Sequence, residues 1–199
     1  MELVLGRDEE PELAISLPLG AGRLTREFLT ANPPTRKQLK TVRRHVRDTL
    51  SEVLDRLRWE GPPRRVVATS KTFKQLSRLP GAAPQRKGPF VTRELVVADL
   101  REWLPRPART PAAERAALRG ISRPRAPQVE AGALAAEVTL TALDVPSVEI
   151  CPWALREGIL LRHLEREAAT PALPVQPLTR HPDAKVRQLH PAEEQPVPS

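Results

Sequence analysis

Two short stretches of the chain combine residue types that bind phosphate in proteins. Gly20-Ala21-Gly22-Arg23 follows an apolar segment and runs into a helical pattern, and Thr69-Ser70-Lys71-Thr72 does the same. The first N–H groups of a helix are unpaired and lie at its positive end, and glycines let an anion approach the backbone closely. Each stretch therefore predicts a phosphate-binding turn, with an ordinary turn or helix cap as the alternative. Neither has the G-x-x-x-x-G-K-[ST] spacing of a P-loop.

The remaining reactive residue types give no comparable pattern. The four histidines have no metal-ligand spacing, and Cys151 is the only cysteine, which excludes an intrachain disulfide and a Cys-rich zinc site. No serine lies in a nucleophile-elbow pattern. The acidic residues between positions 48 and 55 fit a solvated helix face that pairs with nearby arginines.

Composition limits the classes of partner. The 199 residues carry a net charge of +8, mostly from arginine, which favours phosphates, nucleotides or nucleic acid, although a coding bias explains the same richness. Aromatic residues are only 3% with no tyrosine, which argues against stacking on single-stranded nucleic acid. No run approaches the ~20 apolar residues of a membrane helix, and the N-terminus is acidic where a signal peptide is basic. We expect a soluble cytoplasmic protein without a membrane partner.

The elements that must position the two turns begin with a hairpin. Segments 2–6 and 13–17 read as strands separated by a polar turn that contains a proline. A short helix over 23–28 follows the first glycine turn. Thr35 and Gln38 then form a capping box ahead of a long amphipathic helix that ends before Gly61.

The second turn belongs to a predicted strand-helix unit, with a strand over 65–69 and a helix over 70–76. The order predicts an α/β fold with a mixed sheet, in which strands are reached through helical crossovers. Gly132 lies inside a predicted helix, where close packing on the sheet or an opening for a ligand would explain it. The remaining predictions are helices over 92–104, 110–120, 127–143 and 158–165, a strand over 147–151, and a disordered proline-rich tail from about 167.

Four segments together resemble a known family. Leu17–Thr25, Val67–Thr72, Ala131–Leu134 and, most specifically, Glu149–Gly158 resemble the exopolyphosphatase and guanosine pentaphosphate phosphohydrolase family in an actinobacterial-like form. The resemblance implies a ribonuclease-H-like fold of the sugar kinase, Hsp70 and actin superfamily. It also implies hydrolysis of the terminal phosphoanhydride of polyphosphate or pppGpp with Mg²⁺ as cofactor.

The resemblance assigns roles to residues at matching positions. Glu2 is similar to the last residue of the family's D-I-G-G-G-S-x-E segment, which implies a catalytic position near the metal and the reacting phosphate. The first turn is similar to the family's second-domain glycine turn, and Lys71 stands where a glycine is more usual in the second. Arg125-Ala126-Pro127 lacks the aspartate of the family's R-x-D signature. The implied phosphate-binding residues are Gly20, Gly22, Arg23, Ser70, Lys71 and Thr72.

By the same resemblance, residues 1–166 form the second domain of such a phosphatase without its first strand, and 167–199 form the tail. We therefore expect little hydrolysis by the chain alone, since the family's phosphate loop and general base belong to the missing part. Two unpaired strand edges favour self-association, so a homodimer is one expectation. A non-catalytic module that binds polyphosphate or a guanosine nucleotide, and a basic nucleic-acid-associated protein, are the alternatives.

Overall fold

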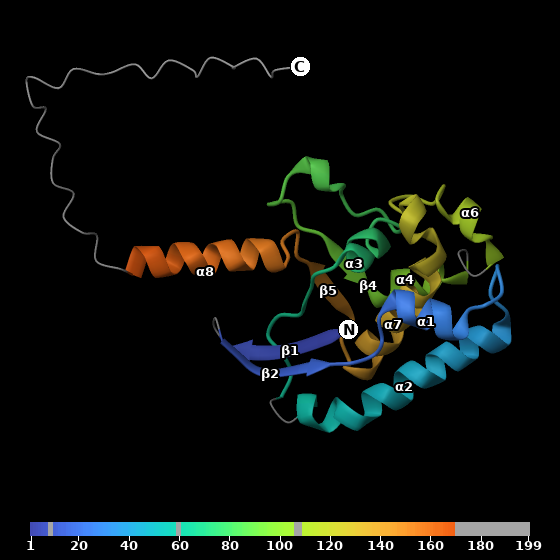
Figure 1. Cartoon of the computed structure of the whole chain (residues 1–199), viewed down its shortest axis with the longest axis horizontal. Helices are drawn as coiled ribbons and strands as arrows, with labels where there is room; N and C mark the ends of the chain where they lie inside the picture. Colours follow the sequence, from blue (N-terminus) through green and yellow to red (C-terminus); the bar gives the residue numbers. More distant parts are fainter. Residues whose placement is uncertain (8–9, 59–60, 106–108, 170–199) are drawn as a thin grey trace, which may run out of the picture. The chain divides into compact units, whose positions relative to one another are not determined.

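A computed structural model describes residues 1–7, 10–58, 61–105 and 109–169 (Figure 1). The chain divides into two compact units, Met1–Ile159 and Leu160–Ser199. Most of the predicted tail lies outside the described residues, so the boundary near 167 stays a prediction. None of the described helices is both long and apolar enough to cross a membrane.

The described part of the chain alternates strands and helices as an α/β fold. The strands are β1 (Glu2–Arg7), β2 (Glu10–Ser16), β3 (Val67–Ala68), β4 (Glu94–Val96) and β5 (Ser147–Ile150). The helices are α1 (Ala21–Phe28), α2 (Arg36–Arg58), α3 (Lys71–Leu76), α4 (Val97–Trp103), α6 (Ala112–Arg115), α7 (Val129–Ala142) and α8 (Leu155–Ala169). Two 3-10 turns cover Gln85–Lys87 and Arg123–Gln128.

The predicted hairpin is confirmed. β1 and β2 pair antiparallel, with Leu3 opposite Ile15 and a register shift after Leu5. The Met1 amino group donates to the Leu17 carbonyl at 2.6 Å, and the Leu17 N–H donates to the Met1 carbonyl at 2.8 Å. These bonds fix the start of the segment that leads into the first glycine turn.

β5 is the central strand of a separate three-stranded sheet. It pairs parallel with β3 on one side and antiparallel with β4 on the other. In the described residues β1 pairs only with β2, and β3 only with β5. The carboxyl ends of β3 and β5 therefore meet at one edge of the sheet, where the second candidate turn begins.

The prediction of one helix over 92–104 is wrong at its start. β4 occupies Glu94–Val96, and α4 begins only at Val97. The run from Leu95 to Val97 is apolar and largely β-branched, so it fits a short strand as well as a helix. The helix predicted over 110–120 is also shorter than expected, since α6 ends at Arg115.

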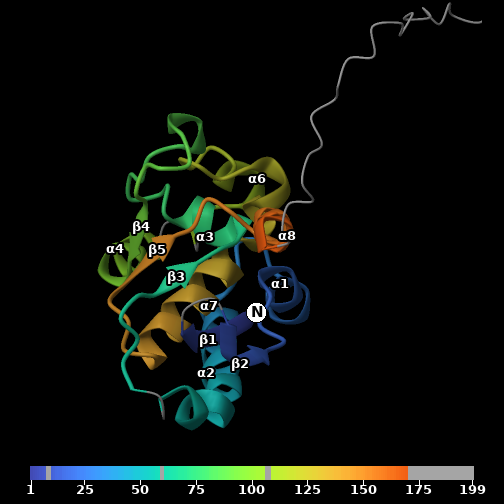
Figure 2. The ribbon, with the colours of Figure 1, turned by 90° about the vertical axis from the view of Figure 1, so that its left-hand side faces the viewer.

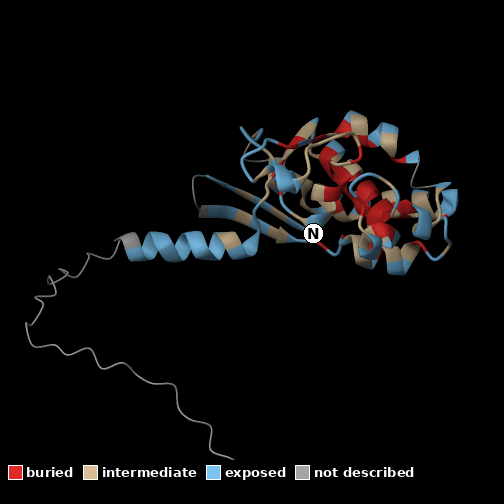
Figure 3. Ribbon diagram, turned by 90° about the horizontal axis from the view of Figure 1, so that it is seen from above, coloured by how far each residue is buried: buried red, intermediate tan, exposed pale blue. Residues whose placement is uncertain are grey.

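α7 forms the centre of the core (Figure 3), where buried residues gather. It is apolar on nearly all sides, as expected for a helix enclosed by other elements. α2 packs against it (Figure 2) and buries Val42, Val46 and Leu50. The predicted capping box is confirmed at the start of α2, where the Thr35 N–H donates to Gln38 Oε1 at 2.9 Å and the Gln38 N–H donates to Thr35 Oγ1 at 3.2 Å.

Candidate phosphate-binding site

The first glycine turn ends at the start of α1 with no side chain capping the helix. Gly20 has the extended backbone of an N-cap residue, and the first turn of α1 has no acidic residue. Leu19 and Leu24 are buried on either side, which anchors the turn in the core. A Cβ atom at Gly20 would meet nothing within 4 Å. The helix start is therefore open to an anion, with its positive end and unpaired N–H groups available.

The second turn leads from β3 into α3. Ser70 Oγ accepts from the Phe73 N–H at 3.1 Å, so Ser70 caps α3, which is the alternative that the sequence left open for this turn. This bond uses a lone pair of the hydroxyl, and its proton donates to no described residue. Lys71 is exposed and Thr72 is half-buried.

The Cys151–Ala154 segment is tied to the second turn. Thr69 Oγ1 donates to the Trp153 carbonyl at 2.6 Å, and Lys74 Nζ donates to the Pro152 carbonyl at 2.6 Å. Both bonds follow from the parallel pairing of β3 and β5, which brings the ends of the two strands together. Two of the four segments that carry the family resemblance, Val67–Thr72 and Glu149–Gly158, therefore meet in one local structure.

Gly132 brings the two turns together. A Cβ atom at this position would lie 2.6 Å from Thr72 Cγ2 and 3.3 Å from Ala21 Cβ. The glycine in α7 thus allows the starts of α1 and α3 to approach the same point of one helix. The close packing expected at this glycine is therefore present, but it is packing against the starts of α1 and α3 and not on the sheet.

The structure adds polar residues that sequence reasoning had not assigned to the first turn. A Cβ atom at Gly22 would lie 3.3 Å from Gln128 Oε1 and 3.6 Å from Arg26 Nη1. Gln128 Oε1 also accepts from Arg125 Nη1 at 3.3 Å. In the sequence, Arg125 stands out only because Arg125-Ala126-Pro127 lacks the aspartate of the family's R-x-D signature. Arg26 gave no sequence signal beyond its position one turn into the helix.

Two sequence-assigned residues make local contacts. Arg23 Nε lies 3.1 Å from Glu27 Oε1, one turn along α1. Glu2 is exposed and accepts from Ser16 Oγ at 2.9 Å across the hairpin. Their roles in phosphate binding and catalysis stay predictions.

The described residues contain no group of three or more His, Cys, Asp or Glu side chains that could hold a metal ion. Mg²⁺ sites in phosphate enzymes often use one or two carboxylates, with substrate oxygens and water as the other ligands. Among the described residues, Glu2 offers one carboxylate for such a site, and its assignment to the metal stays a prediction.

A buried carboxylate lies in α7 two residues before Gly132. Glu130 is 1% exposed, and its Oε2 has no hydrogen-bond partner within the described part of the chain. Burial raises the pKa of Glu130 to about 7, although the positive charges of Arg115 and Arg43 oppose this rise. Glu130 and Arg43 line a pocket of about 380 Å³ together with Leu39, Arg101, Leu104, Pro105, Leu134 and Glu137. Sequence reasoning had not singled out this residue.

Known proteins of similar sequence support the family resemblance that the four segments indicate. The chain is 51% identical to exopolyphosphatase 1 of Mycobacterium leprae over 173 residues, which cover 87% of this chain and 51% of that protein. It is 49% identical to an uncharacterized protein of Streptomyces coelicolor over 167 residues, which cover 83% of this chain and 49% of that protein. The chain thus spans about half the length of the curated relatives it matches.

Solved structures share the fold. The crystal structure of the Aquifex aeolicus member of the Ppx/GppA family matches with a TM-score of 0.72 and 26% identity, over 83% of this chain and 53% of that one. An exopolyphosphatase from Cytophaga hutchinsonii, at 19% identity, matches with a TM-score of 0.71 over 83% of this chain and 54% of that one. The sequence model of the Ppx/GppA phosphatase family matches residues 1–167 of this chain. The chain belongs to the Ppx/GppA phosphatase family.

Proposed function

We propose that this chain forms the second-domain wall of the active site of an enzyme that removes terminal phosphate from polyphosphate or pppGpp. The observation that carries the proposal is the approach of the α1 and α3 starts to one point at Gly132. Two turns with phosphate-binding composition, 50 residues apart, come together on one helix. The relatives named exopolyphosphatase 1 support polyphosphate as the substrate class.

In this proposal the chain binds and orients the phosphate chain. The backbone N–H groups at the start of α1 donate to a non-bridging oxygen, and Arg26 and Arg125 lie close enough to the turn to balance negative charge. The Ser70 proton and the Lys71 ammonium offer further donors from the second turn. Positioned donors of this kind stabilise the charge of a transferring phosphoryl group.

Glu2 is the proposed acidic residue of this wall. It is exposed, and its one described side-chain hydrogen bond comes from Ser16. When Mg²⁺ is bound, the ion supplies positive charge that balances the phosphate oxygens. The exposure of Glu2 supports this role, because a metal ligand must be accessible to the ion.

The finer features of the fold are also proposals. The matched solved structures have an actin-like fold, and we propose that the family's D-I-G-G-G-S strand pairs at the free edges of β1 and β3. Since the chain covers half the length of its relatives, the general base is proposed to come from a first domain. We expect the 199 residues alone to bind polyphosphate and to hydrolyse it slowly, because loss of a general base costs about 10²–10⁴ in rate.

The variant Gly20→Asp tests this function. Aspartate is a preferred N-cap residue, and Gly20 has the extended backbone and open space that it needs, so the free energy of unfolding should rise by a few tenths of a kcal/mol. The same carboxylate occupies the free N–H groups and repels an anion. We expect affinity for tripolyphosphate, measured by calorimetry, to fall at least tenfold while thermal stability is kept or raised.

Gly158→Asp is the matched control, because a Cβ atom at Gly158 also meets nothing within 4 Å. An equal loss of affinity in both variants would indicate a general charge effect and contradict the proposal. Phosphate release with Mg²⁺, measured in the same samples, separates an enzyme from a binding module. Turnover by the 199 residues at the rate of full-length relatives would contradict the expectation of slow hydrolysis.

A further inference from the structure

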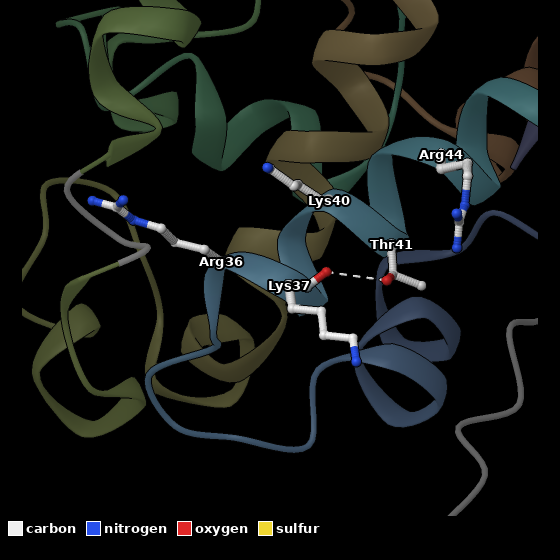
Figure 4. A pocket seen from close by; sticks show the side chains of 5 residues that line it. All are labelled: Arg36, Lys37, Lys40, Thr41 and Arg44. Atoms are coloured by element: carbon white, nitrogen blue, oxygen red, sulfur yellow. Dashed lines mark hydrogen bonds between the residues drawn. The ribbon is translucent and has the colours of Figure 1, made fainter.

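The first three turns of α2 carry an unusual concentration of positive charge. Between positions 36 and 47 there are six Lys or Arg residues and no Asp or Glu. Five residues of this segment line a surface hollow of about 480 Å³ (Figure 4). We call them the basic strip: Arg36, Lys37, Lys40, Thr41 and Arg44.

The cations of the basic strip have no acidic partner among the described residues. Their side chains are exposed and make no ion pair or side-chain hydrogen bond there. Thr41 Oγ1 donates to the Lys37 carbonyl at 3.0 Å, which is a bond within the helix (Figure 4). By contrast, the neighbouring Arg43 forms an ion pair, with its Nε 3.6 Å from Glu137 Oε2. Within positions 36–47, Arg43 is the cation with a described acidic partner, and the four cations of the strip have none among the described residues.

This arrangement works against the stability of α2. Positive side chains in the first turn of a helix lie at the positive end of its dipole, which destabilises the helix. Like charges four residues apart, as in Arg36 and Lys40, also repel one another. The strip gains no contact that offsets these costs. Residues that destabilise the element they belong to are typical of a functional surface. A bound polyanion would offset both the unfavourable interaction with the helix dipole and the repulsion between the cations.

The spacing of the strip fits an extended anion. Arg36, Lys40 and Arg44 follow one another every four residues on one helix face, with an axial step of about 6 Å. Lys37 and Thr41 form the adjacent row. A single phosphate reaches only part of this length, whereas a long phosphate chain can contact several cations at once.

The residue types favour polyphosphate over nucleic acid. None of the five lining residues is aromatic, so none offers a face on which a base could stack. None is Asn or Gln, the side chains that pair with adenine. The strip therefore offers positive charge without a surface on which a base could stack, and its Arg and Lys side chains, which can also pair with guanine, make DNA binding the competing outcome of the test.

We propose that the basic strip is a second polyphosphate-binding surface, which holds the part of a long chain that lies beyond the turns at Gly20 and Ser70. The choice of polyphosphate rests on the proposed function. α2 contributes no residue to either turn, so the strip and the turns can be altered separately. A short phosphate chain uses the turns alone, and a long chain uses both surfaces.

The test compares native protein with the double variant Arg36→Glu/Lys40→Glu, using calorimetry with tripolyphosphate and with long-chain polyphosphate at several salt concentrations. We expect affinity for the long chain to fall at least tenfold, with a salt dependence reduced by about two contacts. Affinity for tripolyphosphate should change less than twofold. Thermal stability should be kept or raised, since acidic residues favour a helix N-terminus.

The control is Arg56→Glu/Arg64→Glu, which changes the net charge equally at exposed positions near the other end of α2. Equal effects of the two double variants on the long chain, or no effect of either, would overturn the inference. Tighter binding of single-stranded or duplex DNA than of polyphosphate, lost in the strip variant, would overturn it in favour of nucleic acid. Loss of tripolyphosphate binding in Gly20→Asp tests the proposed function independently, so the two failures are distinguishable.

Discussion

Gly132 is the residue on which the candidate site depends most directly. A Cβ atom there would lie 2.6 Å from Thr72 Cγ2, closer than such atoms approach in proteins. We expect Gly132→Ala to force α3 away from α7 and to lower the free energy of unfolding by about 1–3 kcal/mol, as overpacking does. Chemical denaturation measures this loss, and calorimetry measures the accompanying loss of tripolyphosphate affinity.

The partner variant Thr72→Ser checks the physical reason. It removes Cγ2 and keeps the hydroxyl, so the double variant Gly132→Ala/Thr72→Ser should recover most of the lost stability. If the effects of the two substitutions on the free energy of unfolding simply add, contact between the new Cβ and Thr72 Cγ2 is not the cause of the lost stability. Affinity that returns together with stability would show that the distance between the two turns matters for binding.

Glu130 gives the chain a pH dependence of stability. Its pKa is raised from 4.5 to about 7 by burial, so the folded state binds the proton more tightly than the unfolded state. The resulting stabilisation is complete below about pH 4.5 and is lost as the pH rises through about 7. The difference corresponds to about 3 kcal/mol.

The variant Glu130→Gln should lack this contribution, because an amide does not titrate in this range. Urea unfolding at pH 5 and pH 8 measures the change in both proteins. Glu137→Gln, on the same helix, should keep the decline that Glu130 causes. A native chain that is equally stable at both pH values, or a Glu130→Gln variant that declines as steeply, would contradict the assignment.

At the scale of elements, the second turn depends on hydrogen bonds from its neighbours. The Thr69 hydroxyl donates to the Trp153 carbonyl at 2.6 Å, and Trp153 also meets the ring of Phe90 edge-on at 6.4 Å between centroids. We expect Thr69→Val to cost about 1 kcal/mol and to increase hydrogen exchange at the start of α3. Thr92→Val, an exposed threonine outside any strand or helix, is the control. Unchanged exchange at Ser70–Phe73 would contradict a role for this bond.

Elements with several agreeing signals could be predicted from the sequence. α2 has a long apolar period, a capping box and a Gly-Pro-Pro sequence after its end, and its bounds are close to those expected. β4 could not be predicted, because the short apolar run Leu95–Val97 fits a strand or a helix, and only the pairing of Glu94–Val96 with β5 decides between them. Short elements of this kind depend on tertiary contacts that the local sequence does not contain.

The candidate site was predictable in its parts but not in its assembly. Glycines and hydroxyls before helices identified both turns, since that signal is local. The meeting of Ala21 and Thr72 at Gly132 depends on how three helices pack, and the raised pKa of Glu130 depends on its burial. Neither follows from spacing along the chain. The basic strip was visible only as arginine richness, until the structure showed which cations lack partners.

At the scale of the whole molecule, two strand edges can pair with a second copy of the chain. In the described residues β1 pairs only with β2, and β3 only with β5, and Val4 and Val67 on these strands are exposed. Unpaired edges with apolar side chains are templates for intermolecular pairing. We therefore expect concentration-dependent self-association in sedimentation velocity experiments.

Lysine on an edge strand opposes such pairing, so Val4→Lys and Val67→Lys should each shift the distribution toward monomer without a large loss of stability. α8 offers a competing surface, because Leu160 and Leu164 are also exposed. The control Leu160→Lys/Leu164→Lys distinguishes association through α8 from association through the strand edges. If only the α8 variant is monomeric, self-association depends on that helix and not on the strand edges. A native chain that stays monomeric at high concentration would contradict association through either surface. If the edges are responsible, a peptide that carries the D-I-G-G-G-S sequence should compete with self-association, because it would pair with the same N–H and C=O groups.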